Sequence, residues 1–180
     1  MLKKWILTAC LFSLSGSAFG FFDLEAFYGR RWYKKLIGQG SEASIGLNFD
    51  PVPLAPLSFG ASYSLIDLDK PTLGSPAEAR IRELSLNLKT WLTMVPFVTP
   101  YLRAHYIAYS NLIVSFDDSK RDIDTRLRGY GLGLGVNYKL IPLIHLQLEL
   151  SQSWQNAENI EGKEEDLISN SILFGIQIGI

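Results

Sequence analysis

Hydrophobic and polar residues alternate along most of this chain, and the alternation is clearest from residue 129 to residue 138. There the sequence reads Gly-Tyr-Gly-Leu-Gly-Leu-Gly-Val-Asn-Tyr. Successive side chains of a β-strand point to opposite faces, so this segment has one apolar face and one nearly bare glycine face. The apolar face runs from Tyr130 to Tyr138, which is roughly 20 Å along the bilayer normal at a tilt of ~40°. Aromatic residues at both ends of such a row are typical of a strand whose outer face crosses lipid.

The same alternation occurs in seven further segments, and no amphipathic helix pattern competes with them. In chain order the predicted strands are residues 21–32, 43–50, 58–65, 83–92, 101–109, 129–138, 144–153 and 168–180. We therefore predict an all-β fold, an eight-stranded antiparallel up-and-down transmembrane β-barrel. One domain spans residues 21–180.

The connections between the predicted strands differ in chemistry. The first, third, fifth and seventh are predicted to be long and charged. The second, fourth and sixth are short, apolar and contain proline, which fits hairpin ends because it donates no ladder hydrogen bond. They read Val52-Pro53-Leu54, Val95-Pro96-Phe97 and Ile141-Pro142-Leu143. This pattern predicts short turns at one end of the barrel and long loops at the other.

Residues 1–20 have the pattern of a secretory signal peptide. Two lysines precede an apolar stretch, and small residues lie just before the expected cleavage site ahead of Phe21. Cleavage removes Cys10, the only cysteine, so no disulfide is expected in the mature chain. The leader holds two of the 17 lysines and arginines and none of the 18 acids, which leaves a charge of −3. That balance does not indicate a nucleic-acid partner.

One face of each predicted strand collects the charged residues, and the other face carries almost none. On the fifth strand, for example, the charged face runs through Tyr101, Arg103, His105, Ile107 and Tyr109. A soluble sandwich or lipocalin-like barrel, with its charged faces outside, is the alternative. The glycine face of 129–138 and the apolar turns favour the membrane barrel, because glycines inside a narrow barrel leave room for larger side chains across the lumen.

In the membrane barrel the charged faces point into the lumen, where opposite charges must pair because an uncompensated buried charge costs several kcal/mol. Two interpretations are open: a closed plug of salt bridges, or a gate whose pairs exchange to admit water or small ions. Eight strands enclose little more than their own side chains, which favours the plug. The predicted lumen charge network consists of Glu25, Glu83, Lys89, Arg103, His105, His145 and Glu149.

The outer surface offers two groups of candidates. Aromatic residues at the ends of the apolar rows are expected at the lipid interface: Tyr28, Trp32, Tyr130 and Tyr138. Basic residues at the end of the first strand are expected where lipopolysaccharide phosphates lie, although an ordinary charged loop base explains them equally well. These basic residues are Arg30, Arg31, Lys34 and Lys35.

An enzyme is a further possibility, because some small outer-membrane barrels modify lipid A with histidine, serine and an acid. This chain has only His105 and His145, both predicted inside and neither in a His-x-Ser arrangement. The acidic run from Glu161 to Asp166 lacks metal-ligand spacing and fits a solvated loop. We therefore predict a protein without catalytic activity, cofactor or metal.

With these features the whole chain after residue 20 resembles the small eight-stranded outer-membrane barrels of Gram-negative bacteria, the class of OmpA-type transmembrane domains and OmpX-like proteins. The resemblance implies a monomer in contact with outer-membrane lipids and lipopolysaccharide, with both termini in the periplasm. The alternating apolar residues Phe174, Ile176 and Ile178 are similar to the C-terminal signal that the barrel assembly machinery reads. That class usually ends in an aromatic residue, whereas this chain ends in Ile180.

Overall fold

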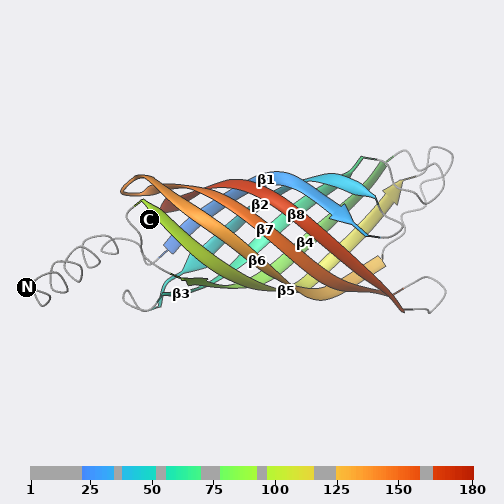
Figure 1. Ribbon diagram of the computed structural model, residues 1–180. Coiled ribbons are helices and arrows are strands. Elements are labelled where there is room, and N and C mark those ends of the chain that lie inside the picture. Colours follow the sequence, from blue (N-terminus) through green and yellow to red (C-terminus); the bar gives the residue numbers. More distant parts are fainter. Residues whose placement is uncertain are drawn as a thin grey trace, which may run out of the picture.

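The computed structural model describes residues 22–34, 38–51, 56–69, 78–92, 97–115, 125–158 and 164–180. The predicted signal peptide lies outside these residues. Eight strands form a single barrel (Figure 1). Their bounds are β1 Phe22–Tyr33, β2 Gln39–Phe49, β3 Leu57–Leu68, β4 Glu78–Trp91, β5 Val98–Ser115, β6 Thr125–Ile141, β7 Ile144–Glu158 and β8 Glu164–Gly179. The described part of the chain contains no helix of the length and apolarity needed to cross a bilayer.

Every strand pairs antiparallel with the next one along the chain, and β8 pairs with β1 to close the ring. The backbone N–H of Ile180 donates to the carbonyl of Phe22 at 2.8 Å, so the last strand is bonded to the start of the first. The predicted eight-stranded up-and-down barrel is confirmed. Because the sheet is closed, no strand has a free edge.

We call the end of the barrel where β1 begins and β8 ends the proximal end, and the opposite end the distal end (Figure 1). The predicted alternation of short and long connections holds in the middle of the chain, where residues 69–77 and 116–124 form long connections and residues 142–143 a short one. It is wrong for the first connection, because residues 34–38 join β1 to β2 and the longer segment 50–56 joins β2 to β3. Polar residues that read as loop are paired strand at the distal end, as in the Asp67–Arg80 pair of β3 and β4. A closed ladder satisfies the backbone of polar segments as well as apolar ones.

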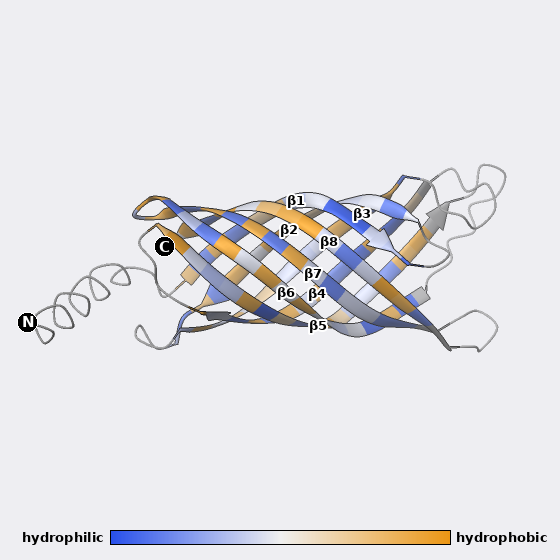
Figure 2. Ribbon diagram, viewed as in Figure 1, coloured by the Kyte–Doolittle hydropathy of each residue, from blue (hydrophilic) through white to orange (hydrophobic). Residues whose placement is uncertain are grey.

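Hydrophobic and hydrophilic residues alternate along the strands (Figure 2), and exposed and buried positions alternate in the same way. The outward positions of the strands are apolar and exposed, as with Tyr130 and Leu132 of β6. Most of the buried side chains are polar or charged. This distribution is the inverse of a soluble protein and is the one expected of a barrel surrounded by lipid.

A β-bulge in β5 changes one predicted face. Ser85 of β4 pairs with Ile107 and Leu84 pairs with Tyr109, so Ala108 is an extra residue in the ladder. The extra residue reverses the alternation beyond it. Tyr109, predicted inside, is 48% exposed on the outer surface, and Ser110 takes the buried position.

Candidate functional site: the filled lumen and the distal rim

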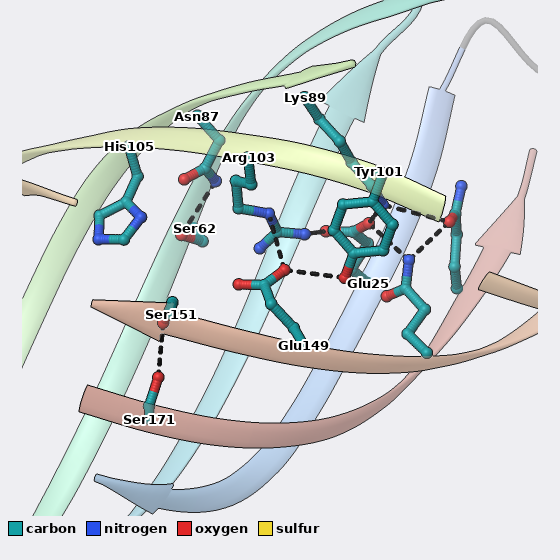
Figure 3. A network of polar contacts seen from close by, with 12 residues as sticks. Glu25, Ser62, Asn87, Lys89, Tyr101, Arg103, His105, Glu149, Ser151 and Ser171 are labelled. Atoms are coloured by element: carbon teal, nitrogen blue, oxygen red, sulfur yellow. Dashed lines mark hydrogen bonds and ion pairs between the residues drawn. The ribbon is translucent and has the colours of Figure 1, made fainter. Parts of the chain in front are cut away.

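Four charged side chains from four strands meet inside the barrel near its proximal end, and we call them the proximal ion cluster (Figure 3). They are Glu25 of β1, Lys89 of β4, Arg103 of β5 and Glu149 of β7. One oxygen of Glu25 lies 2.5 Å from Lys89 Nζ, and the other lies 2.6 Å from an Arg103 nitrogen. Arg103 Nε lies 3.2 Å from Glu149 Oε2. Two buried acids therefore face two buried bases, and the cluster is neutral as a whole.

Neutral polar groups bind the remaining faces of these carboxylates. The Tyr101 hydroxyl donates to Glu149 at 2.8 Å, and Gln147 Nε2 donates to Glu25 at 3.0 Å. Gln147 also donates to Gln177 at 2.7 Å. Buried charges are tolerated when such additional hydrogen bonds replace the lost water. The proximal lumen is thus filled by one connected polar network.

Aromatic rings enclose the two cations of this cluster. Lys89 Nζ lies 4.1 Å from the centre of the Tyr101 ring and 4.4 Å from that of Trp91. The Arg103 guanidinium lies 5.0 Å from the Phe27 ring. Cation–π contacts of this kind stabilise a desolvated cation by about 2 kcal/mol or more. They also fill the space through which an ion would have to pass.

The glycine face of β6 makes room for this network. A Cβ atom at Gly135 would lie less than 3.0 Å from the Tyr101 ring, and one at Gly131 would lie equally close to the His105 ring. Both are closer than real Cβ atoms approach other atoms. The glycines of β6 therefore allow large side chains of β5 to lie flat across the neighbouring strand.

A second group of buried charges, the distal ion cluster, consists of Arg31 of β1, Glu42 of β2 and Glu83 of β4. The Arg31 guanidinium donates two bonds to Glu42, at 2.7 and 2.9 Å, and a third to Glu83 at 2.7 Å. Gln155 of β7 donates to the other oxygen of Glu83 at 2.5 Å. A forked, charge-assisted arrangement of this kind holds each side chain in one orientation.

Arg31 requires a correction to the sequence interpretation, which groups it with surface residues that face lipopolysaccharide. Its side chain is only 5% exposed and lies inside the lumen. The reason is that β1 continues as a regular strand past Gly29 to Tyr33, so Arg31 stays on the same inward face as Glu25. Glu42 is absent from the predicted network, because the predicted second strand begins at residue 43 whereas β2 begins at Gln39.

Apolar side chains close the lumen beyond the distal ion cluster, and we call them the distal apolar plug. They come from six of the eight strands. The plug consists of Tyr33, Ile66, Leu68, Ala79, Ile81, Leu112, Leu127 and Leu167. This group is not predicted from the sequence, because all of its members lie beyond the predicted strand ends.

The three groups are stacked along the barrel axis. Inward residues of β1 follow the order Glu25, Arg31, Tyr33 from the proximal end, and those of β4 follow the order Lys89, Glu83, Ile81. Six residues separate the two ion clusters on each strand, which is about 15 Å along the axis at a tilt of ~40°. Any solute crossing the lumen meets all three groups in series.

The two histidines have different surroundings. His105 Nε2 lies 3.0 Å from Ser153 Oγ within the lumen. Its ladder partner Asn87 lies between Lys89 and Glu83 along β4, so His105 lies between the two ion clusters. His145 is half-buried near the proximal end, and its Nδ1 has no hydrogen-bond partner among the described residues. Neither histidine belongs to an ion cluster, although the sequence analysis places both in one network with them. Within the described ranges, no group of three or more histidine, cysteine or acidic residues is arranged to hold a metal ion.

The outward surface carries the aromatic residues singled out in the sequence. Tyr28, Trp32, Tyr130 and Tyr138 are all exposed on the outer wall. Tyr130 stacks on Trp154 of the neighbouring strand, with ring centres 5.5 Å apart. Apolar residues separate Tyr130 from Tyr138 along β6.

The remaining basic candidates lie at the distal rim or beyond the described residues. Arg30 is exposed and forms an ion pair with Asp69. Lys34 is exposed, and Lys35 lies outside the described residues. The structure does not bring these residues into one basic cluster.

A different set of exposed cations, which we call the distal arginine patch, does cluster at this rim: Arg82 of β4, with Arg126 and Arg128 of β6. Arg82 and Arg126 both pair with Asn111 of β5, so they lie two strands or about 10 Å apart. Within the described part of the chain, none of the three arginines forms an ion pair with a carboxylate.

An apolar outer wall, aromatic residues near its ends and a filled polar interior define the class of this fold: it is an eight-stranded barrel of the outer-membrane type. Solved structures of outer-membrane proteins share this fold. This chain is similar to Neisserial surface protein A (TM-score 0.73, 16% identity, 88% of this chain and 97% of that chain). It is also similar to Ail, the attachment invasion locus protein of Yersinia pestis (TM-score 0.56, 10% identity, 89% of this chain and 99% of that chain). A third similar structure is the outer membrane enzyme PagL (TM-score 0.57, 11% identity, 88% of this chain and 99% of that chain).

The likeness to these outer-membrane proteins is one of fold. No family model and no curated protein matches the sequence. The three structures are named as a surface protein, an attachment protein and an enzyme. The same barrel therefore serves several activities, and a function for this chain has to be argued from its own side chains.

Proposed function

We propose that this chain is an integral outer-membrane protein with a closed lumen, whose distal end faces the cell exterior and whose role is structural or in surface contacts. Both termini then lie in the periplasm. The fold shared with outer-membrane surface proteins supports this location. The alternatives are a narrow pore for ions or small solutes and a lipid A-modifying enzyme.

The stacking of three closed groups along the axis carries the proposal. Opening the proximal ion cluster would separate Glu25 from two cations at once, and the Arg31 fork and the apolar plug would still close the distal half. Breaking a buried ion pair costs about 3–5 kcal/mol, so thermal opening of two such clusters together is rare. The lumen therefore serves as a rigid core.

Conductance tests the closed lumen directly. The protein is refolded into planar bilayers, and its folded state is checked by the gel mobility of unboiled and boiled samples. We expect single-channel conductance at the background of protein-free bilayers. Stepwise channels in wild type that change their ion selectivity in Glu25→Gln would replace the structural proposal with a gated pore.

The absence of catalysis is the second part of the proposal. His105 points into the lumen toward Ser153, with the wall of the barrel between it and lipid. Comparison of lipid A from cells with and without the protein, by mass spectrometry, is expected to show identical acylation and phosphorylation. Loss of a group from lipid A only in the presence of the wild-type protein would establish an enzyme.

A surface role has its own support in the distal arginine patch. Lipopolysaccharide phosphates lie at the level of the aromatic residues near the barrel rim, and guanidinium groups bind phosphate through paired hydrogen bonds. Arg82, Arg126 and Arg128 are free of carboxylate partners in the described part of the chain and surround Tyr109, which the β5 bulge turns outward. We place the lipopolysaccharide contact here, in preference to Arg30 and Lys34.

The test measures lipopolysaccharide that remains bound during purification. The triple variant Arg82→Gln, Arg126→Gln, Arg128→Gln is expected to retain several-fold less than wild type, and the difference should shrink at high salt because exposed charges are screened. Lys139→Gln, near the proximal end, is the control and should retain the wild-type amount. Equal retention by the triple variant would remove this surface role.

A further inference from the structure

The outer wall from β5 through β6, β7 and β8 to β1 carries a shallow, open groove of about 460 Å³. One edge is a row of side chains that lie side by side across four strands. In order from β1 to β6 this edge consists of Trp32, Asn170, Gln152 and Leu132. The row starts at an aromatic residue near the distal rim and ends among the aliphatic side chains of the wall.

The opposite edge is the next outward row, and it is entirely apolar. It consists of Ile172, Leu150, Leu134 and Leu102. Between the rows lie Gly133, which has no side chain, and Ser151 and Ser171, whose hydroxyls bind each other inside at 2.6 Å. The floor of the groove is therefore backbone.

The dimensions and direction suit a single hydrocarbon chain. Four strands at ~4.8 Å spacing give a length of about 14 Å between the outermost strands. Rows of paired residues run perpendicular to tilted strands, so the groove crosses the wall obliquely. It descends from the level of Trp32 into the apolar zone, as an acyl chain descends from its headgroup.

Two amide side chains on one edge of the groove are the unusual feature. Gln152 Nε2 donates to Asn170 Oδ1 at 3.0 Å. Among the described residues, Gln152 Oε1 and Asn170 Nδ2 make no hydrogen bond. Their outward neighbours Leu150 and Ile172 are apolar, and a polar group left without a partner in lipid costs several kcal/mol. A lipid group that carries both a donor and an acceptor would satisfy these two free atoms.

We propose that this groove binds one 3-hydroxyacyl chain of lipid A, with the chain between the two rows and its polar head against Gln152 and Asn170. Gln152 presents an acceptor and Asn170 a donor side by side. The hydroxyl and amide of such a chain supply both a donor and a carbonyl acceptor at its head. The ester-linked chain of a phospholipid supplies acceptors alone. The proposal rests on the orientation given above, with the distal end toward the outer leaflet.

Native mass spectrometry of the whole protein, released from detergent with defined added lipids, tests the site. Wild type is compared with Gln152→Leu/Asn170→Leu, which places aliphatic groups on a lipid-facing wall and is expected to leave the barrel folded. The matched control Gln39→Leu changes an exposed amide on β2, which does not line the groove. Each protein is offered lipid A, dephosphorylated lipid A, or a diacyl phospholipid.

We expect wild type and Gln39→Leu to retain one lipid A per barrel, and the double variant to bind it roughly thirtyfold more weakly, because two hydrogen bonds of ~1 kcal/mol each are lost. Dephosphorylated lipid A should show the same difference, which separates the groove from the distal arginine patch. Equal binding by wild type and double variant would overturn the proposal. So would equal retention of the phospholipid by wild type.

Discussion

Glu25 and Arg103, 78 positions apart in the sequence, face each other across the lumen at 2.6 Å. The same carboxylate also bonds Lys89 at 2.5 Å, so one acid holds two cations from adjacent strands β4 and β5. Glu25 thereby connects the first strand to the opposite wall of the barrel. The lumen is bonded across its width as well as around its circumference.

Replacing Glu25 by glutamine should destabilise the barrel strongly, because two buried cations then share a neutral partner. We expect a loss of about 3–5 kcal/mol in the free energy of unfolding, measured by urea titration in lipid vesicles. Asp69→Asn, which breaks the exposed pair with Arg30, is the control and should cost less than about 1 kcal/mol. Similar losses for the two variants would contradict a buried, interlocked cluster.

Arg31 and Arg30 are adjacent in sequence, but the same substitution should destabilise the barrel at Arg31 and have almost no effect at Arg30. Arg31→Gln leaves Glu42 and Glu83 without their common cation. We expect the temperature at which heated samples lose the gel mobility of the folded form to be several degrees lower than in wild type. Arg30→Gln should leave that temperature almost unchanged. If Arg30→Gln is the more destabilising variant, Arg30 points into the lumen and Arg31 points outward.

Gly135→Ala tests the packing of the β6 glycine face. The added methyl group would meet the Tyr101 ring, which is fully buried and held by Glu149. Overpacking of this kind costs about 1–3 kcal/mol, and we expect a smaller folded fraction on unboiled gels. At Gly179 the nearest atom to an added methyl group is 3.5 Å away, so Gly179→Ala should fold like wild type.

The outward facing of the apolar rows can be read with single cysteines carrying a nitroxide. Leu132 is 58% exposed and Leu146 is 42% exposed, whereas Ser169 is 2% exposed. In vesicles we expect the labels at Leu132→Cys and Leu146→Cys to collide with oxygen, which concentrates in lipid. The label at Ser169→Cys should be protected from oxygen. The reverse ranking would describe a soluble barrel.

Removing one layer of the lumen should leave the barrel closed. Arg103→Ala/Glu149→Ala deletes half of the proximal ion cluster but leaves the Arg31 fork and the apolar plug in place. We expect its bilayer conductance to stay at background, with reduced resistance to urea as evidence that the cluster was disrupted. Steady conductance in this variant would mean that the distal layers are open to ions.

The sequence predicts the strands well because a period-two pattern is a local property. The row from Tyr130 to Tyr138 is correctly placed on the outer wall, since facing depends on parity alone. The prediction fails where the alternation is interrupted. The extra residue Ala108 turns the side chain of Tyr109 from the inner to the outer face, and no feature of the local sequence indicates this change. A bulge is determined by the partner strand.

The layers of the lumen were predictable only in part. Charge on an inward face indicates Glu25, Lys89 and Arg103, but their pairing depends on the register of β4 and β5 with β1 around the barrel. The distal apolar plug is not predicted for another reason. Its leucines and isoleucines lie in segments beyond the lipid-facing part of the strands, and the sequence pattern assigns those segments to loops. The proximity of the outward amides Gln152 and Asn170 depends on the register of β7 and β8, which the sequence alone does not give.

The bond from Ile180 to Phe22 has a consequence for biogenesis. The ring cannot close until β8 pairs with β1, so a chain without β8 has two unpaired strand edges, one on β1 and one on β7. Such edges recruit other chains and seed aggregates. A chain that lacks β8 therefore cannot complete the hydrogen-bonded ring.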